Sequence, residues 1–203
     1  MIVGTSLFDG SVAILGLARS GMATARALMA GGNPVLAWDD SPERVTAAAR
    51  AGIPVQDSAD FDWRGIAALV PSPGIPLDHP TIVSAQASGV EIIGDVEILW
   101  RAMAERKYVG ITGTNGKSTT TALIGHILEH ARQTVQIGGN LGAPALSLDA
   151  LWAEGTYAIE MSSFQLDLTR NISFDIAVLL NIAPDHLDRH GSMNAYIAAK
   201  RKI

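Results

Sequence analysis

One glycine-rich segment, residues 110–119, constrains the fold of this chain more than any other stretch. It reads Gly-Ile-Thr-Gly-Thr-Asn-Gly-Lys-Ser-Thr and lies between an apolar run that begins at Tyr108 and a helical pattern that begins at Thr120. A strand, a glycine loop and a helix in this order predict a phosphate-binding loop, because unpaired N–H groups at a helix N-terminus attract anions. In such a loop Lys117 reaches the outer phosphates and the Ser118 hydroxyl binds a magnesium ion.

The loop departs from the strict pattern at one position. Ile111 lies where that pattern has a glycine, and the nearest glycines are Gly110 and Gly113. The alternative interpretation is a glycine-rich turn that contains Gly-Lys-Ser by chance. The strand before the loop and the helix after it favour phosphate binding over this alternative.

The composition narrows the class of protein. The chain has 203 residues, of which 48% are hydrophobic, which is enough to bury a sizeable core in one or two domains. A net charge of −5 argues against nucleic acid or an anionic membrane as the main partner. The absence of cysteine excludes disulfides and thiolate metal sites. No apolar run approaches the ~20 residues that span a bilayer, and the N-terminus does not resemble a signal peptide, so we expect a cytoplasmic protein.

The first part of the chain alternates strands and helices. Strands are expected at residues 11–15, 34–38 and 67–70, and a helix is expected to open at Gly21. A second helix is expected after Ser41, which has the side chain of a helix cap. This alternation predicts a Rossmann-like parallel sheet whose ligand lies beyond the carboxyl ends of its strands.

The loop at residues 16–21 resembles a dinucleotide fingerprint in which Ala18 replaces the middle glycine. That glycine lets the backbone approach a pyrophosphate closely, so Ala18 argues against NAD. Arg19 and Ser20 supply donors instead, as suits a diphosphate held partly by side chains. Asp39 lies where a ribose-binding acid is expected. The alternative is a turn with a purely structural role.

A boundary between two domains is expected near Gly94. Residues 1–94 form the first predicted domain, and residues 95–203 contain part of a P-loop-type ATPase α/β domain. Asp95 is expected to cap a helix that runs to the basic pair at residues 106–107.

Polar residues follow the later predicted strands, at the edge that carries the phosphate loop. The strands are expected at residues 134–137, 156–159 and 175–180, and the polar residues are Asn140, Glu160, Gln165, Asp185 and His186. We expect these side chains to converge on one cleft, where Glu160 binds the same magnesium ion as Ser118. Each has an alternative role: Asn140 in a turn, Glu160 as a helix cap and His186 as a surface histidine.

Together these motifs resemble the Mur ligase family along essentially the whole chain. The resemblance is carried by the segments 112–119, 138–140, 160–166, 181–190 and 196–200. The phosphate loop is shared with folylpolyglutamate synthetases, whereas Ser-Ser-Phe-Gln-Leu within 160–166 is more selective.

Two further segments, 72–75 and 94–97, favour the branch of the family that adds D-glutamate. The resemblance then implies an ATP-dependent amide-bond-forming ligase of peptidoglycan precursor synthesis, acting on UDP-N-acetylmuramoyl-L-alanine and D-glutamate through an acyl phosphate. The alternatives are a non-catalytic module that binds a nucleotide sugar and ATP, or another Mur-type or folylpolyglutamate-type ligase.

The resemblance also implies a set of site residues. The ATP-binding residues would be Gly113, Thr114, Asn115, Gly116, Lys117, Ser118 and Thr119. The residues that bind the UDP substrate would be Arg19, Ser20, Asp39, Asp40, Ser72, Gly74, Asn140, Ser162 and Gln165. The catalytic residues would be Lys117, His186 and Lys200. One Mg²⁺ would lie on Ser118 and Glu160, and a second on His186 and a carbamate of Lys200.

The end of the sequence limits the expected activity. The chain ends at Ile203 in a helical pattern, whereas the family continues with the rest of its central domain and a third domain that supplies the D-glutamate pocket. We therefore expect these 203 residues to lack ligase turnover. The resemblance implies a monomer for the full-length form.

Overall fold

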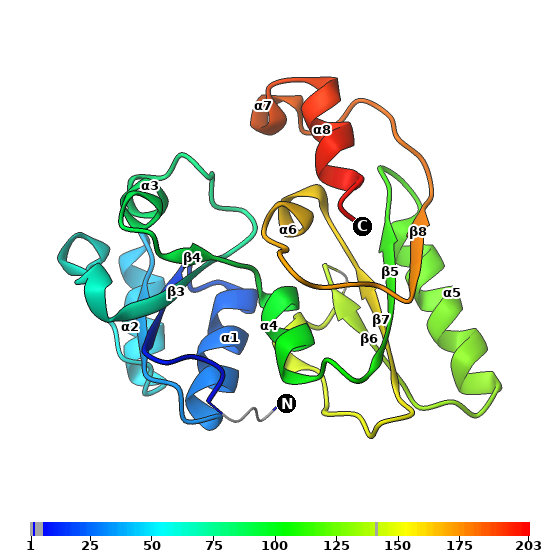
Figure 1. Cartoon of the computed structure of the whole chain (residues 1–203), viewed down its shortest axis with the longest axis horizontal. Helices are drawn as coiled ribbons and strands as arrows, with labels where there is room; N and C mark the ends of the chain where they lie inside the picture. Colours follow the sequence, from blue (N-terminus) through cyan, green and yellow to red (C-terminus); the bar gives the residue numbers. More distant parts are fainter. Residues whose placement is uncertain (1, 3–5, 141) are drawn as a thin grey trace.

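The computed structural model describes residue 2, residues 6–140 and residues 142–203. Within these residues, two four-stranded sheets lie side by side, in the strand orders β2-β1-β3-β4 and β6-β7-β5-β8 (Figure 1). All strand pairs in both sheets are parallel. The predicted α/β class, with a Rossmann-like sheet followed by a P-loop-type sheet, is confirmed.

The first sheet is built around a fully buried central strand. Its strands are β1 (Ser11–Leu15), β2 (Val35–Trp38), β3 (Ile66–Pro71) and β4 (Glu91–Ile92). Val12 and Ile14 are completely buried, because helices cover both faces of a parallel sheet. The helices of this part are α1 (Arg19–Ala30), α2 (Pro42–Arg50) and α3 (Pro80–Ala87), and α4 (Asp95–Ala102) follows between the two sheets.

The second sheet carries the phosphate loop on its central strand. Its strands are β5 (Lys107–Thr112), β6 (Val135–Gly139), β7 (Thr156–Glu160) and β8 (Ile176–Leu179). The helices are α5 (Lys117–His130), α6 (Ser163–Asp167), α7 (Leu187–His190) and α8 (Met193–Lys200). Short 3₁₀ turns lie at Ser58–Asp60, Trp63–Gly65 and Ala145–Ser147.

Helix α1 begins at Arg19, two residues before the expected start. Gly21 has a different role. A Cβ atom at this position would lie 1.8 Å from the Gly16 carbonyl oxygen, so glycine is required for the loop to pass close to the helix. The predicted cap of α2 is confirmed, since the Ser41 side chain accepts a hydrogen bond from the Arg44 N–H.

Helices α4 and α8 also differ from expectation. Gly94, not Asp95, is the N-cap of α4, and Asp95 is the first helical residue. The helix ends at Ala102, before the expected basic pair at residues 106–107, and Lys107 belongs to β5. Helix α8 ends at Lys200 instead of continuing.

Helix α4 connects the two sheets through a buried carboxylate. Glu97 is 0% exposed, and its oxygens accept hydrogen bonds from the N–H groups of Arg170, Asn171 and Ile172, each at about 3 Å. Arg101 of the same helix donates its Nε–H to Glu97 and its terminal nitrogens to Glu91 of β4. The first sheet and the loop after α6 are therefore held by one ionic network.

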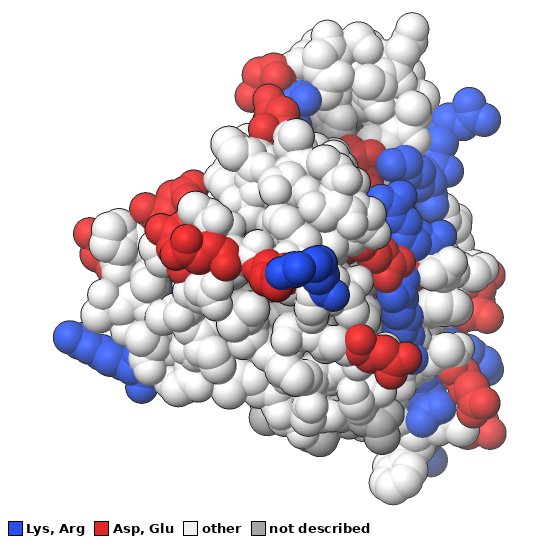
Figure 2. Space-filling model, turned by 60° about the vertical axis from the view of Figure 1, so that its left-hand side comes forward, with Lys and Arg blue, Asp and Glu red and all other residues white. Residues whose placement is uncertain are grey.

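The surface carries both signs of charge. Figure 2 shows acidic and basic side chains on one face, some of them adjacent, among large uncharged areas. None of the helices in the described part of the chain combines the length and apolar character needed to cross a membrane.

Glu97→Gln is expected to destabilise the fold by about 3 kcal/mol, because a buried charge that accepts several hydrogen bonds is replaced by an amide that also carries donors. Denaturant unfolding measures the change. Glu129→Gln, on the exposed side of α5, is the matched control and should change the free energy of unfolding by less than about 0.5 kcal/mol. Equal stability of the two variants would contradict the role of Glu97.

Candidate functional site

The phosphate loop has the backbone that binding requires. Gly113 and Gly116 have φ angles of 152° and 82°, a region that favours glycine, and Gly116 is the N-cap of α5. Lys117 folds back over the loop, where its Nζ donates to the carbonyl oxygens of Gly113 and Thr114, both at 2.9 Å. The N-terminus of α5 and this ammonium both lie at the loop, which suits a polyphosphate.

The carboxylate of Glu160 lies beside this loop, at the end of β7. It is 1% exposed and accepts hydrogen bonds from Ser118 Oγ at 2.8 Å and from Asn140 Nδ2 at 2.7 Å. Three of the expected site residues therefore meet across three segments of the second sheet. A carboxylate and a hydroxyl are hard oxygen donors of the kind that Mg²⁺ prefers, so this pair fits the ion.

Lys200 is buried next to the phosphate loop. It is 2% exposed, and its Nζ donates to the Gly113 carbonyl oxygen at 2.8 Å and to Thr112 Oγ1 at 3.3 Å. Burial, together with the positive charge of Lys117, lowers the pKa of the Lys200 amine to about 8. The Lys200 amine therefore has a far larger neutral fraction near pH 8 than an exposed lysine has.

His186 lies nearby without a direct bond to Lys200. Its side chain is 51% exposed, its Nε2 lies 3.5 Å from Asp185 Oδ2, and its ring centroid lies 4.9 Å from that of Phe164. The described residues contain no hydrogen bond between His186 and Lys200, nor a group of three or more acidic or histidine side chains arranged around a metal.

The carboxyl ends of β1, β2 and β3 border a cavity of about 630 Å³. It is lined by Leu15, Gly16, Ala18, Ser20, Asp39, Asp40, Ser41, Arg44, Ser72, Gly74 and Ile75. The volume is within the usual range of small-molecule sites. Five of the residues expected to bind the UDP substrate line it: Ser20, Asp39, Asp40, Ser72 and Gly74.

Asp39 already has backbone partners at this cavity. Its carboxylate accepts hydrogen bonds from the N–H groups of Leu17 at 2.6 Å and Ser41 at 2.8 Å, and it is 6% exposed. It thus holds the first loop against the start of α2. Asp40 is more exposed and lies 3.2 Å from His79 Nε2.

A second cavity, of about 240 Å³, lies between the two sheets. It is lined by Ala18, Arg19, Ser20, Pro73, Asp95, Gly139, Asn140, Gly142, Pro144 and Gln165. It brings Arg19 and Ser20 of the first part together with Asn140 and Gln165 of the second. Arg19 reaches across and donates to the Gly142 carbonyl oxygen.

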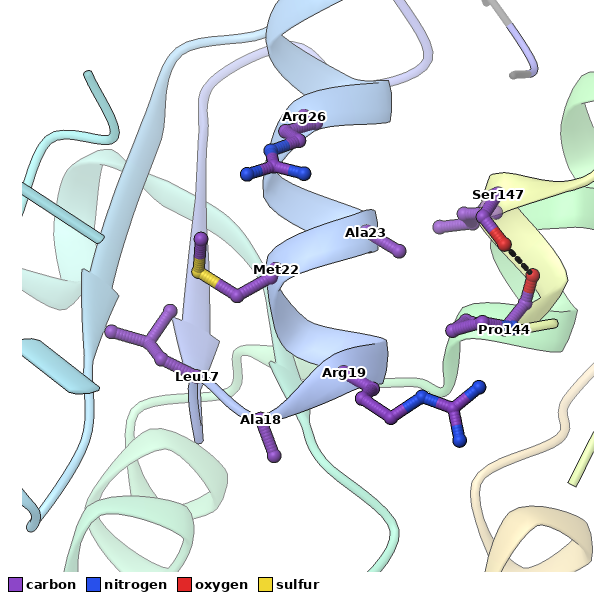
Figure 3. A pocket seen from close by; sticks show the side chains of 9 residues that line it. Leu17, Ala18, Arg19, Met22, Ala23, Arg26, Pro144 and Ser147 are labelled. Carbon is purple, nitrogen blue, oxygen red and sulfur yellow. Dashed lines mark hydrogen bonds between the residues drawn. The ribbon is translucent and has the colours of Figure 1, made fainter. Parts of the chain in front are cut away.

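Arg19 also borders a third cavity, of about 560 Å³, beside α1. Figure 3 shows its side chain extending from α1 toward the segment that carries Pro144, while Arg26 lies two turns further along the helix. The guanidinium thus lies where the first and second parts of the chain meet.

Ser162 and Gln165 form a capping box at the start of α6. Ser162 Oγ accepts from the Gln165 N–H, and Gln165 Oε1 accepts from the Ser162 N–H at 3.1 Å. With its oxygen held by the helix cap, Gln165 directs its amide nitrogen to the Asp95 carboxylate. Both residues therefore have an orientation set by the helix end.

Asp95 is the site residue that sequence reasoning did not identify. It was interpreted as a helix cap, but its side chain is 4% exposed and lines the cavity between the sheets. Burial raises the pKa of the Asp95 carboxyl to about 6. The sequence feature that could have identified Asp95 as a site residue is its position in the Gly-Asp-Val-Glu segment, residues 94–97.

Comparison with known proteins gives a consistent picture. Residues 111–203 match the family model of the Mur ligase middle domain. The chain is 49% identical to "UDP-N-acetylmuramoylalanine--D-glutamate ligase" of Phenylobacterium zucineum (strain HLK1), in an alignment that covers 100% of the chain and 45% of that protein. It is 53% identical to the protein of the same name from Rhodospirillum rubrum, covering 94% of the chain and 42% of that protein. The chain thus spans less than half the length of these curated relatives.

A solved structure shows the same fold. The UDP-N-acetylmuramate:L-alanyl-gamma-D-glutamyl-meso-diaminopimelate ligase from Neisseria meningitides superposes with a TM-score of 0.58 at 19% sequence identity. The match covers 96% of this chain and 68% of that chain. At this identity the likeness concerns the fold alone.

Asp95→Asn is expected to change how stability depends on pH. The pKa of Asp95 in the folded state is about 6, above the ordinary value of 3.8, so the folded state keeps the proton to a higher pH than the unfolded state does. The contribution of Asp95 to stability therefore falls as pH rises from about 4 to 6. The stability of the wild type relative to Asp95→Asn should fall by about 2 kcal/mol across this window. Thermal or denaturant unfolding at pH 4 to 7 measures it. Asp9→Asn, at an exposed position, is the control, and parallel pH profiles of wild type and Asp95→Asn would refute the expectation.

Proposed function

Because this chain belongs to the Mur ligase family, we propose that it provides the nucleotide-sugar-binding and ATP-binding parts of an ATP-dependent ligase that adds D-glutamate to UDP-N-acetylmuramoyl-L-alanine. Such a reaction belongs to peptidoglycan precursor synthesis and uses the ATP of the cytoplasm. Residues 1–94 would hold the nucleotide sugar, and residues 95–203 would hold ATP. The names and identities of the relatives support this assignment.

The observation that carries the proposal is the position of Asn140. Its side chain donates to Glu160 beside the phosphate loop, and the same residue lines the cavity between the sheets with Arg19 and Gln165. A ligand that extends from the first sheet through this cavity therefore brings its far end toward the phosphates on the loop. This geometry suits a transfer between a nucleotide sugar and ATP.

The proposed chemistry follows from the poor reactivity of a carboxylate. A carboxylate oxygen of the muramoyl-alanine attacks the γ-phosphorus of ATP, so that an acyl phosphate and ADP form. The amine of D-glutamate then attacks the acyl carbon, and the tetrahedral intermediate expels inorganic phosphate as the amide forms and the amine loses its proton. Lys117 offsets the repulsion between the two anions of the first step, and the α5 N-terminus holds the phosphates.

Magnesium is the cation that the site residues fit. Ser118 and Glu160 would hold one ion, which supplies charge neutralisation at the phosphates when bound. An ammonium cannot ligate a cation, so Lys200 would join His186 at a second ion only as a carbamate. The lowered pKa of the Lys200 amine supports this modification, because only the neutral amine attacks CO₂.

A binding module without turnover is the second candidate for these 203 residues. The observation that favours it is the missing direct contact between His186 and Lys200 in the described structure. Binding of the nucleotide sugar is common to both candidates and is tested first.

Calorimetric titration is expected to show that the chain binds UDP-N-acetylmuramoyl-L-alanine more tightly than UDP and does not bind NADH. Arg19→Met should weaken binding about tenfold or more, because a charged donor to the diphosphate is lost. Arg50→Met, at the exposed end of α2, is the matched control, and Lys117→Met should leave sugar binding intact while weakening ATP binding. Binding of NADH alone would refute the proposal in favour of an oxidoreductase.

Carbamate formation at Lys200 is expected to increase with pH at a fixed concentration of dissolved CO₂. With a pKa of about 8, the neutral amine should rise from about 10% at pH 7 to about 90% at pH 9. Carbon-13 NMR with labelled CO₂ detects the product. Lys200→Arg should remove the signal, whereas Lys202→Arg, at an exposed lysine, should retain it. A signal that persists in Lys200→Arg would assign the carbamate elsewhere.

A further inference from the structure

Arg189 of α7 joins two parts of the chain that are far apart in sequence. Its Nη1 lies 3.5 Å from the Gly74 carbonyl oxygen, and its Nη2 donates to the Ile75 carbonyl oxygen at 2.5 Å. Its guanidinium carbon lies 4.9 Å from the centre of the Phe164 ring. The loop after β3 in the first sheet is therefore held against α6 and α7 of the second.

The Phe164 ring also contacts two histidines, His186 and His190, which precede and follow Arg189 in the sequence. Its ring centroid lies 4.9 Å from that of His186 and 5.4 Å from that of His190, the latter in a stacked arrangement. His190 Nε2 is also 2.9 Å from Ser163 Oγ. A change in the position of Arg189 on this ring therefore alters the surroundings of both histidines.

The loop that Arg189 binds lines the cavity at the carboxyl ends of β1, β2 and β3. Ser72, Gly74 and Ile75 line the 630 Å³ cavity of the first sheet, and Ser72 Oγ donates to the Gly16 carbonyl oxygen in the opposite loop. Gly74 also lines a cavity of about 790 Å³ that contains His186 and Arg189. One loop is thus shared between the first-sheet cavity and the surroundings of His186.

The chemistry of arginine suits this double contact. A guanidinium presents its flat face to an aromatic ring while the nitrogens at its edge donate to carbonyl oxygens. A lysine ammonium has no such plane and cannot make both contacts in the same way. The contact depends on this one side chain, since Gly74 and Ile75 contribute only backbone oxygens to it.

We propose that Arg189 is a positioning residue that couples occupancy of the first-sheet cavity to the placement of His186. A nucleotide that orders the loop at residues 72–75 orders the carbonyl groups that Arg189 binds, and Arg189 transmits this to Phe164 and the histidines. The coupling rests on the nucleotide binding proposed above, whereas the contact itself does not.

The contact is tested first without a ligand. In Arg189→Met, amide hydrogen exchange is expected to rise about tenfold both at residues 72–76 and at residues 185–191, because both segments lose the same partner. Arg50→Met is the control and should leave both segments unchanged. Phe164→Leu removes the ring under the guanidinium and provides a second variant, and circular dichroism checks that each variant is folded. Unchanged exchange in folded Arg189→Met would overturn the proposal.

The coupling is tested by NMR of the histidine side chains on addition of UDP. His79 is paired with Asp40, which lines the first-sheet cavity, so the His79 resonance is used to detect UDP binding in that cavity. His126 and His130 lie on α5 and serve as internal controls. In the wild type, UDP should shift the resonances of His79 and of His186. In Arg189→Met, the His79 shift should remain and the His186 shift should fall by at least about half.

Each outcome separates this inference from the proposed function. Retention of the full His186 shift in Arg189→Met would overturn the coupling while leaving nucleotide binding intact. A wild type in which UDP shifts His79 but not His186 would also overturn it. A wild type in which UDP shifts neither would refute the proposed nucleotide site and the coupling together, whereas the exchange experiment would still decide whether Arg189 holds the two segments.

Discussion

The parallel pairing of β5 with β7 is the constraint on which the rest of the site depends. In this register Ile111 pairs with Glu160, so the strand that leads into the phosphate loop and the strand that ends in the carboxylate finish at the same edge. Because side chains alternate between the faces of a strand, a shift of one residue would turn Glu160 away from Ser118. The hydrogen bonds from Ser118 and Asn140 then hold the carboxylate in place. The oxygen donors near the loop are thus a consequence of strand register.

Two arginines hold the sheets together at different depths. Arg101 acts in the interior, where it binds Glu91 and the buried Glu97 that in turn holds the loop after α6. Arg189 acts at the rim, where it binds only backbone carbonyl oxygens and a ring. The inner network is costly to break, because it would leave a buried charge without partners. Loss of the outer contact leaves no buried carboxylate without partners, which suits a contact that responds to a ligand.

The two lysines of the second sheet share one acceptor. Lys117 and Lys200 both donate to the Gly113 carbonyl oxygen, at 2.9 Å and 2.8 Å. Their mutual repulsion adds to the effect of burial and favours the neutral form of Lys200. The lowered pKa of Lys200 increases the fraction of neutral amine, which is the form that the proposed carbamate requires.

The sequence by itself determined the alternation of strands and helices, the phosphate loop and the polar residues that follow the strands, but it did not predict helix α3. These features depend on local patterns: apolar runs for buried parallel strands, glycines for the loop and Ser41 for a helix cap. The tertiary structure alone decided the starts of α1 and α4, the backbone partners of Asp39, the place of Asp95 in the cavity and the contacts of Arg189. These features depend on which segments the fold brings together. The sequence does not show which distant segments become neighbours, so the packing of the two sheets sets them. Gly21 shows the difference clearly, because its need for glycine comes from the Gly16 carbonyl group that the fold brings against it.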